Sequence, residues 1–552
     1  MPFKKIIILI AFILPFTGKS QTTHLLPGMK DEWLLNRMSV KYNPDYLKFS
    51  SLKPYNRRDA VKDIQQIDSV AAGVSAVDRY NIESFLMSNT EWSMARESFN
   101  SNKPFLKHFY KNKANASELK QEGFHLIFNP IIQYQQYKEN NNDENVFLNS
   151  RGLYARGLIE NKIGFSFYFT ENQERPPMYV SDWVNKYEAV PAIGYYKFFN
   201  NSTTAFDYFD IRATASWKVA KPIDMQIGYD KNFIGNGYRS LFLSDFSANY
   251  MHLKINSRFG RFHYQNIFAE LYSPYDKSLG DRIFPRKYYR AHYLNFAATN
   301  WLNLGLFEGT MLGNNGGIPL RLFNPVIFLQ IPGTKNAVQD RNYIGFDLKA
   351  NLLNRFQLYG QLMIDKLKPD GLKNKTWDNR FGYQAGIKYI DLLGLNNVDL
   401  QVEINRVRPY TYAANDEITS YVHYNQPLAH PLGANFKEMI AILRAQPIKK
   451  LYLQGKIVSY NQGLSVGAYN FGNDVFGGFD NRLSDNNINI GEGNTATCLI
   501  GSFLASYELK QNLFIDANFT KRNYKTLNAP ENNTTFLSIG LRWNMARREF
   551  DF

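Results

Sequence analysis

Apolar and polar residues alternate with a period of two from about residue 122 to the end of the sequence. In residues 537–545 every second residue is apolar, and residues 398–405 and 451–457 follow the same pattern. Because successive side chains of a β-strand point to opposite faces, each segment is predicted to be a strand with one apolar and one polar face. Two carboxylates, Asp399 and Glu403, lie on the polar face of one of these strands.

The connections between the predicted strands alternate in length. Tight connections occur at residues 159–162, 219–222, 258–261, 352–355, 446–450 and 509–512, and long ones at residues 313–340, 409–435 and 461–496. A soluble β-sandwich would need a second layer over every apolar face. Short turns at one end and long loops at the other are typical of an outer-membrane barrel, whose closure also leaves no open sheet edge. The pattern therefore predicts an all-β fold, a transmembrane antiparallel β-barrel.

The number of strands follows from a parity argument. A first count gives 19 candidate strands, but with both ends of the barrel domain in the periplasm the number must be even. Treating residues 192–199 as a strand puts the tight connections at 159–162 and 219–222 on opposite sides. Assigning residues 192–199 to a loop restores consistency at about 18 strands, with 16 and 20 as alternatives.

Composition agrees with a barrel and excludes a helical membrane protein. Aromatic residues make up 15% of the 552 residues, yet the mean hydropathy is negative. No window of about 18 apolar residues follows the N-terminal segment. The net charge of +15 suits an acidic polysaccharide or lipid phosphates as a partner, or serves solubility alone. Nothing in the pattern points to nucleic acid.

The N-terminal segment is predicted to be a secretory signal peptide, residues 1–20. Lys4 and Lys5 precede an apolar run from Ile6 to Phe16, and Ser20 precedes the expected cleavage site. Export leads to the outer membrane of a Gram-negative bacterium. The single cysteine, Cys498, excludes an internal disulfide.

Residues 21–118 are predicted to form a small helical periplasmic region, and residues 119–552 the barrel. Apolar residues recur at helical spacing before the barrel, as at Val61, Ile64 and Ile67. A disordered leader is the alternative. If the region sits at the periplasmic mouth, its apolar stripes must be buried against one another or against the barrel turns.

One motif departs from the strand pattern, the segment GYDKNFIGNGYRSLFLS at residues 228–244. A dinucleotide-binding loop would need a third glycine where Ser240 stands, and would lead into a helix. Another loop and strand follow instead. The expected role of Gly235 and Gly237 is therefore to give the loop backbone freedom.

This motif resembles the signature of the Wzi-like capsule-assembly family of outer-membrane barrels. The segment DKNFIGNGYRS is most similar to the Bacteroidota branch of this family, which includes the gliding-motility protein RemB. The segment LFNPVIFLQ at 322–330 resembles a second conserved segment, or landmark, of the family. The resemblance implies a periplasmic helical region before an 18-stranded barrel, and binding of surface polysaccharide without catalysis. It marks as motif positions Gly235, Gly237, Arg239, Ser240, Ser244, Asn324 and Pro325.

We find no sequence signal for an enzyme, a metal site or a cofactor. The eight histidines show no ligand spacing, and no Gly-x-Ser-x-Gly elbow is present. His252 and His263 are predicted to approach each other across the 258–261 turn, as polar lumen or interface residues. The acidic segment 480–494 lacks the alternating aspartates of a calcium loop.

The first functional hypothesis is a barrel that binds or organises capsular polysaccharide in support of gliding motility. The alternatives are a diffusion or export pore, and an accessory subunit of an adhesin-secretion or gliding complex. Stacking on sugar faces and attraction of acidic groups would suit loop aromatics and inward-facing cations. The candidate glycan-binding residues are Tyr410, Tyr412, Tyr421, Tyr424, Phe476, Phe479, Lys254, Lys456 and Arg542. Outer-membrane lipid and gliding or secretion proteins are the other expected partners.

Overall fold

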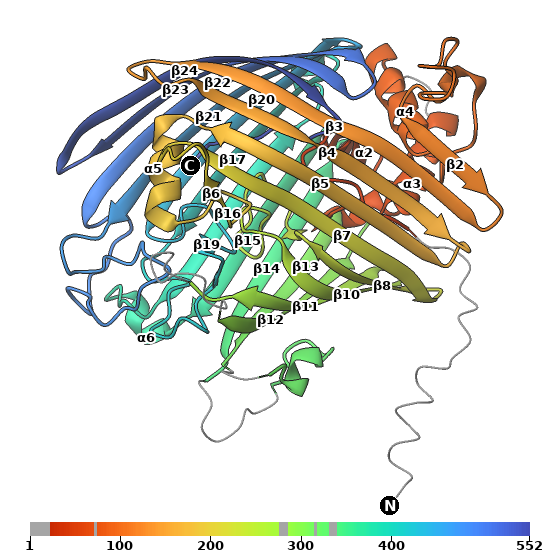
Figure 1. Ribbon diagram of the computed structural model, residues 1–552. Helices are drawn as coiled ribbons and strands as arrows, with labels where there is room; N and C mark the ends of the chain where they lie inside the picture. Colours follow the sequence, from red (N-terminus) through yellow and green to blue (C-terminus); the bar gives the residue numbers. More distant parts are fainter. Residues whose placement is uncertain (1–21, 71–73, 275–284, 314–316, 331–338) are drawn as a thin grey trace, which may run out of the picture.

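The computed structural model describes residues 22–70, 74–274, 285–313, 317–330 and 339–552, and these form a closed antiparallel barrel with the N-terminal helices at one end (Figure 1). The predicted signal peptide lies outside the described residues. Closure pairs the last strand with the first, as Trp543 opposite Ile132 illustrates. Each wall strand thereby has a hydrogen-bonded neighbour on both sides within one sheet, as a membrane requires.

The wall contains 18 strands, as the sequence predicts. They are β3 (Phe124–Glu139), β4 (Val146–Ile159), β5 (Ile163–Arg175), β7 (Phe206–Ala220), β8 (Ile223–Asp230), β10 (Tyr250–Phe259), β11 (Phe262–Tyr272), β12 (Arg286–Ala297), β13 (Leu302–Leu312), β14 (Arg341–Leu352), β15 (Phe356–Lys366), β16 (Arg380–Tyr389), β17 (Val398–Val407), β20 (Phe436–Ile448), β21 (Leu451–Leu464), β22 (Asn494–Lys510), β23 (Leu513–Thr526) and β24 (Ala529–Trp543). Residues 192–199 contribute only the two-residue strand β6 (Lys197–Phe198), which confirms their assignment to a loop.

The remaining elements lie inside the barrel, at its ends or on its outer surface. The short strands are β1 (Leu52–Lys53), β2 (Ser117–Gln121), β9 (Phe233–Ile234), β18 (Val422–His423) and β19 (Gln426–Pro427). The helices are α2 (Lys30–Lys41), α3 (Arg57–Val70), α4 (Ala76–Ser88), α5 (Met178–Tyr187) and α6 (Pro369–Leu372), with 3₁₀ turns η1 (Leu47–Phe49), η2 (Glu97–Phe99), η4 (Leu320–Phe323) and η5 (Leu392–Gly394). No helix of the described chain is long and apolar enough to cross a membrane.

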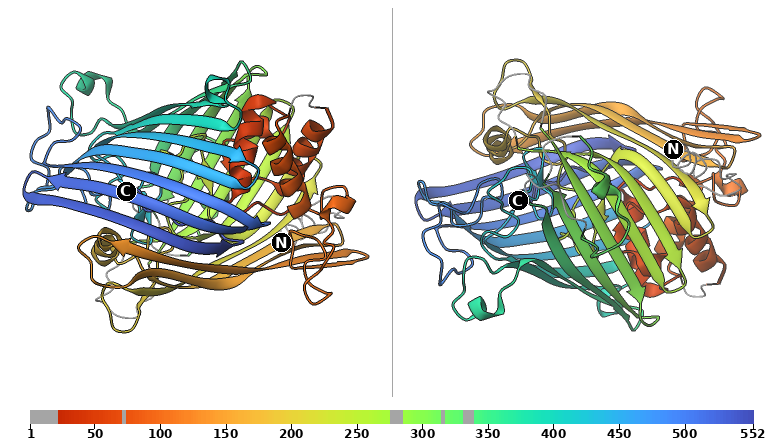
Figure 2. Two further views of the ribbon diagram at one scale, coloured as in Figure 1. Left: turned by 90° about the horizontal axis from the view of Figure 1, so that it is seen from above. Right: turned by 90° about the horizontal axis from the view of Figure 1, so that it is seen from below.

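Helices α2, α3 and α4 form a small core of their own at the end of the barrel that carries the tight turns (Figure 2). Val61, Ile64 and Ile67 are buried there, as their helical spacing predicts, against Ile82 and Phe85. The presence of these helices is confirmed. Strand β2 crosses the expected boundary at residue 118, and the division into domains stays a prediction.

A buried guanidinium joins the helices to the barrel turns. Arg37 of α2 pairs with Asp78 of α4 at 3.1 Å, with Asp391 at 3.0 Å and with Asp399 of β17. Burial alone would lower the pKa of Arg37, but the charges of Asp399 and Asp78 raise it above its ordinary value. Because breaking such a pair would leave an uncompensated buried charge, the network fixes the helices against this end of the barrel.

Loops and the C-terminal segment of the protein fill most of the barrel interior. Two loops turn inward from the wall, residues 231–249 (the first inward loop) and 408–435 (the second inward loop), and almost all of their side chains are buried. The segment 544–552 (the return segment) also runs back from the turn end into the interior. Its Met545 packs near the turns, and Phe552 reaches Trp183 of α5 near the opposite end.

The position of the helices predicts a labelling pattern on cells. Ser69 of α3 and Asn486 of the loop before β22 are both exposed, at opposite ends of the barrel. With the turn end in the periplasm, a Ser69→Cys variant should resist a membrane-impermeant maleimide on intact cells and react once the outer membrane is opened. Asn486→Cys is the control and should react at once. Equal labelling of both variants on whole cells would contradict this orientation.

Candidate functional site in the barrel interior

The glycine motif lies inside the barrel, in the first inward loop. Strand β8 stops at Asp230 and β10 starts opposite it at Tyr250, so the chain leaves the wall part-way along and turns inward. Its strand β9 pairs with β1 of the N-terminal region, and the Gly235 amide donates to the Ser51 carbonyl at 2.7 Å. The motif therefore connects the helices to the wall.

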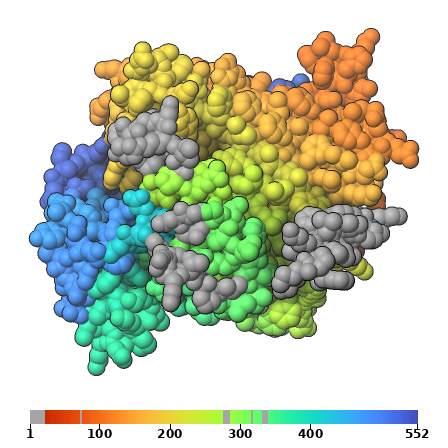
Figure 3. Space-filling model, turned by 60° about the horizontal axis from the view of Figure 1, so that its bottom comes forward, coloured from red at the N-terminus to blue at the C-terminus, as the bar shows by residue number. Residues whose placement is uncertain are grey.

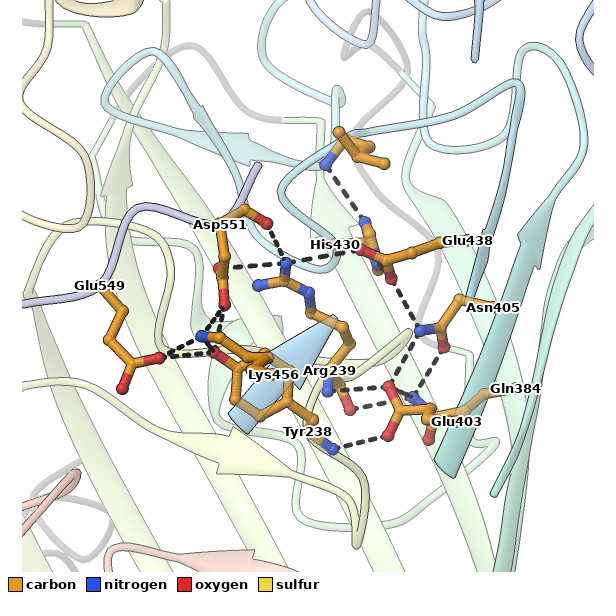
Figure 4. A network of polar contacts seen from close by, with 11 residues as sticks. Tyr238, Arg239, Gln384, Glu403, Asn405, His430, Glu438, Lys456, Glu549 and Asp551 are labelled. Atoms are coloured by element: carbon orange, nitrogen blue, oxygen red, sulfur yellow. Dashed lines mark hydrogen bonds and ion pairs between the residues drawn. The ribbon is translucent and has the colours of Figure 1, made fainter. Parts of the chain in front are cut away.

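Glu403 of β17 holds the centre of this loop (Figure 4). Its carboxylate accepts the backbone amides of Tyr238 at 2.6 Å and Arg239 at 3.0 Å, and the Tyr359 hydroxyl at 2.9 Å. Gln384 of β16 donates to the Arg239 carbonyl at 3.0 Å. Inward-facing wall residues thus replace the pairing that the irregular loop backbone lacks.

Both motif glycines and both motif serines have local structural roles. Gly235 has φ +154°, which favours glycine, and a Cβ on Gly237 would lie 2.5 Å from Oε2 of Glu403. The Ser240 hydroxyl donates to the Ile234 carbonyl at 2.6 Å and accepts the Phe242 amide at 3.1 Å. Ser244 bonds the Ala429 carbonyl of the second inward loop. These contacts hold the loop in place and form no phosphate cradle.

Arg239 extends the network to the return segment. Its guanidinium lies 3.1 Å from Asp551 and 3.4 Å from Glu438, and Glu438 in turn lies 2.7 Å from Nε2 of His430. Lys456 pairs with Asp551 at 2.5 Å and with Glu549. Burial alone would raise the pKa of Asp551, but the charges of Arg239 and Lys456 lower it to about 2. The return segment is therefore held by charge pairs at the motif.

A cavity of about 500 Å³ lies beside this network. Its lining includes Tyr238, Arg239 and the return segment, together with α2 and the facing wall, and has more basic than acidic side chains. Arg444 bonds the amide oxygens of Gln401 and Gln454, each at 3.2 Å, and Lys388 lies 3.4 Å from the Asn36 amide oxygen. The charged part of the lining is therefore basic on balance, and the cavity is bordered on one side by the helices and on another by the first inward loop.

Most predicted glycan-binding residues are buried in this interior. Tyr412 and Tyr421 stack on each other, and Tyr424 packs against Tyr272. Lys254 donates to Asn232 at 3.0 Å, and Arg542 pairs with Asp516 at 2.7 Å. Phe476 lies half-buried beside Tyr187. The buried tyrosines and Lys254 therefore have partners inside the barrel, whereas Arg542 lines the cavity and Phe476 is partly exposed.

Two predicted aromatics meet instead at the loop end, around a tryptophan that the sequence reasoning missed. Trp377 lies 4.8 Å from the Phe479 ring and 6.1 Å from the Tyr410 ring, between centroids. The Arg482 guanidinium lies 4.2 Å from the Trp377 centroid. The loops before β16 and β22 pair here, since Trp377 donates to the Asp485 carbonyl at 3.0 Å. Trp377 and Phe479 are half-buried, and Lys373 and Lys375 beside them are exposed.

The other landmark, with Asn324 and Pro325, lies elsewhere, on the outside of the wall over β11 and β12 (Figure 1). The two family landmarks are thus separated by the barrel wall. His252 and His263 are both buried, and they contact different partners, Tyr250 and Phe49. Among the described residues no group of histidine, cysteine and carboxylate side chains has the arrangement of a metal site.

Glu403 gives a test of how the motif is held. In a Glu403→Ala variant the buried amides of Tyr238 and Arg239 lose their acceptor, which should cost about 2–4 kcal/mol of unfolding free energy in detergent. Hydrogen exchange at residues 237–240 should rise by at least tenfold. The exposed carboxylate Glu417 provides the matched Glu417→Ala control. Unchanged exchange in the Glu403 variant would show that other contacts hold the loop.

Comparison with known proteins finds a match to a family model and matches to solved barrel structures. The family model of the capsule assembly protein Wzi matches residues 215–450, which contain both landmarks. The solved structure of Wzi, an outer-membrane protein involved in group 1 capsule assembly in Escherichia coli and described as a carbohydrate-binding β-barrel, matches with a TM-score of 0.55 at 13% identity, over 96% of this chain and 100% of that one.

Two further solved barrels match at lower TM-scores, and no curated protein sequence matches. OprD of Pseudomonas aeruginosa has a TM-score of 0.42 at 11% identity, over 76% of this chain and 94% of its own. OpdK of Pseudomonas aeruginosa with vanillate has a TM-score of 0.43 at 8% identity, over 76% and 98%. The chain therefore shares the barrel fold of Wzi over nearly its whole length, and its residues 215–450 match the Wzi capsule assembly family.

Proposed function

We propose that this protein is a non-enzymatic outer-membrane barrel that binds surface polysaccharide and helps to organise it at the cell surface. The match to the carbohydrate-binding Wzi barrel, together with the family match at residues 215–450, is the observation that carries this proposal. The interior supports it over a diffusion pore. The two inward loops and the return segment occupy the lumen that a pore would keep open, and the N-terminal helices lie at its turn end.

The polysaccharide contact is assigned to the loop end. A surface polysaccharide meets the barrel from outside, where Trp377 and Phe479 are half-buried and Lys373 and Lys375 are exposed. Aromatic rings suit the apolar faces of sugars, and ammonium groups suit acidic sugars. Asn489, which bonds Lys375 at 2.7 Å, adds an amide at the same surface. This combination favours an acidic glycan.

Binding can be measured with the purified full-length barrel in nanodiscs. We expect polysaccharide extracted from the producing organism, or failing that polygalacturonate, to bind more tightly than dextran. A Trp377→Ala, Phe479→Ala double variant should lose about tenfold in affinity, in line with the energy of two aromatic contacts. A Lys373→Gln, Lys375→Gln variant should weaken binding of acidic chains only. Phe346→Ala, on the membrane-facing wall, is the control.

The possible results of this experiment distinguish an error in the proposed function from an error in the proposed binding site. Absence of binding to every polysaccharide tested would overturn the proposed function. Binding that neither double variant changes would keep the function and remove the loop-end cluster as its site. The Bacteroidota origin, a role in gliding, and protein partners from gliding or secretion complexes stay predictions from the sequence resemblance. Co-purification of the tagged protein from native membranes tests the partners.

A further inference from the structure

The outer wall at β11, β12 and β13 carries polar side chains where a membrane barrel needs apolar ones. Side chains alternate along β12, and since Tyr289 and Tyr293 point inward, Arg290 and His292 point outward. His292 lies 2.8 Å from Asn266 of β11, and Arg290 lies 3.7 Å from Glu308 of β13. Charged groups on a lipid-facing wall are costly, most of all near the middle of the bilayer.

These outward polar groups are nevertheless shielded. Arg290 is 2% exposed and His292 is fully buried, although both face away from the lumen. Residues 317–330 (the flap) cover them. Leu322 of the flap packs with Phe268, Tyr288 and Leu312 of the wall, and Figure 1 shows the η4 turn outside the barrel.

Side chains of the wall form hydrogen bonds with backbone N–H and C=O groups of the flap. Arg290 donates to the Arg321 carbonyl at 2.9 Å, and the Tyr264 hydroxyl donates to the Pro325 carbonyl at 2.7 Å. Glu308 accepts the Phe328 amide at 2.6 Å. Irregular backbone cannot face lipid unless its polar groups are paired within the protein. The outward polar cluster supplies that pairing.

The second family landmark, residues 322–330, also forms hydrogen bonds with the flap backbone, through its own Asn324 side chain. The Asn324 side chain donates to the carbonyls of Val326 at 3.3 Å and Leu329 at 2.8 Å, and accepts the Val326 amide at 3.1 Å. Pro325 has no N–H to satisfy. An asparagine followed by a proline thus removes several unpaired groups from a segment with little regular structure.

The face of the flap turned away from the wall is apolar. Leu320 is 89% exposed, and the other large exposed side chains are Ile318, Phe323, Val326, Phe328 and Leu329. Figure 3 shows this side of the molecule, with green atoms of the wall and flap at the surface. A contiguous apolar patch of this kind is not left in water. Outward residues of neighbouring strands, such as Met251 and Phe346, are also exposed and apolar, so the flap continues the apolar band of the barrel.

The flap also reaches the depth of the membrane. Strand β11 begins at Phe262 beside a tight turn and ends at Tyr272 near the loop end. Pro325 contacts Tyr264, only two residues from the turn end, and Phe323 contacts Phe268 in the middle of the strand. A strand of about 10 residues spans the hydrocarbon layer. The flap therefore extends past the middle of that layer.

We propose that residues 317–330 are a membrane-embedded flap whose outer face contacts lipid acyl chains. The outward polar cluster of β11–β13 anchors it, and the Asn-Pro landmark makes its backbone compatible with lipid. The occupant of the exposed face is lipid because the face is apolar, lies at membrane depth and is continuous with the lipid-facing band. The proposal does not depend on polysaccharide binding.

Spin-label accessibility in liposomes tests this directly. The full chain is reconstituted in phosphatidylcholine with Cys498 replaced by alanine, and single cysteines at Leu320 and Val326 carry a nitroxide. Both labels should be accessible to oxygen and protected from a water-soluble nickel chelate, as a label at Phe346 should be. A label at Asn486 should show the reverse. Nickel accessibility at Leu320 and Val326 equal to that at Asn486 would overturn the proposal, and so would protection from both reagents.

A second variant tests the anchor separately from the fold. Glu308→Ala removes the acceptor of the Phe328 amide, so the label at Leu320 should become at least threefold more accessible to nickel. Asn342→Ala is the matched control, since Asn342 bonds Thr310 on the same wall at 2.9 Å and has no described bond to the flap. Heat-modifiable migration on gels verifies that each barrel is folded. An unchanged label in a folded Glu308→Ala barrel would remove Glu308 as the anchor.

Discussion

The closed ladder of backbone hydrogen bonds is the constraint on which the rest of this structure depends. A membrane offers no water to unpaired N–H and C=O groups, so the chain must pair strand to strand until β24 meets β3. Closure assigns every second side chain to the interior. In β16 and β17 those side chains include Gln384 and Glu403, which are buried and need partners of their own. The inward loops supply those partners with their backbone, so the wall and its contents stabilise each other.

The same requirement for pairing operates on both faces of the wall. Inside, Glu403 accepts amides of the irregular first inward loop, and outside, Glu308 accepts an amide of the irregular flap. In each case a carboxylate replaces a missing strand neighbour. The two landmarks of the sequence, although separated by the wall, thus answer one physical problem, which is how non-strand backbone can lie at membrane depth.

How much could be predicted from the sequence depends on how local the signal is. Strand alternation and tight turns depend on residues that are close together in the sequence. The barrel, its 18 strands and the loop at residues 192–199 can therefore be predicted from the sequence. The contents of the lumen do not. Tyr412 and Tyr421 lie in a long connection and suggest surface aromatics, yet the second inward loop brings them against Tyr343 of the wall. Such contacts join residues that are distant in the sequence, and the periodicity of apolar residues does not predict them. Trp377 was missed because its partner Phe479 lies about a hundred residues away.

The filled interior also bears on how the two ends of the barrel could communicate. The return segment contacts Ile131 and Tyr154 through Met545, the motif through Asp551, and α5 through Phe552. The first inward loop contacts the N-terminal helices through β9 and β1, and it contacts the same Asp551 through Arg239. Arg239 would lose Asp551 as a partner if the return segment moved and would keep only Glu438, so motion of the return segment would disturb the first inward loop. The helices at the turn end are therefore connected to the α5 region at the loop end by a continuous series of contacts. These contacts run through β1 and β9, Arg239 of the glycine motif and the return segment.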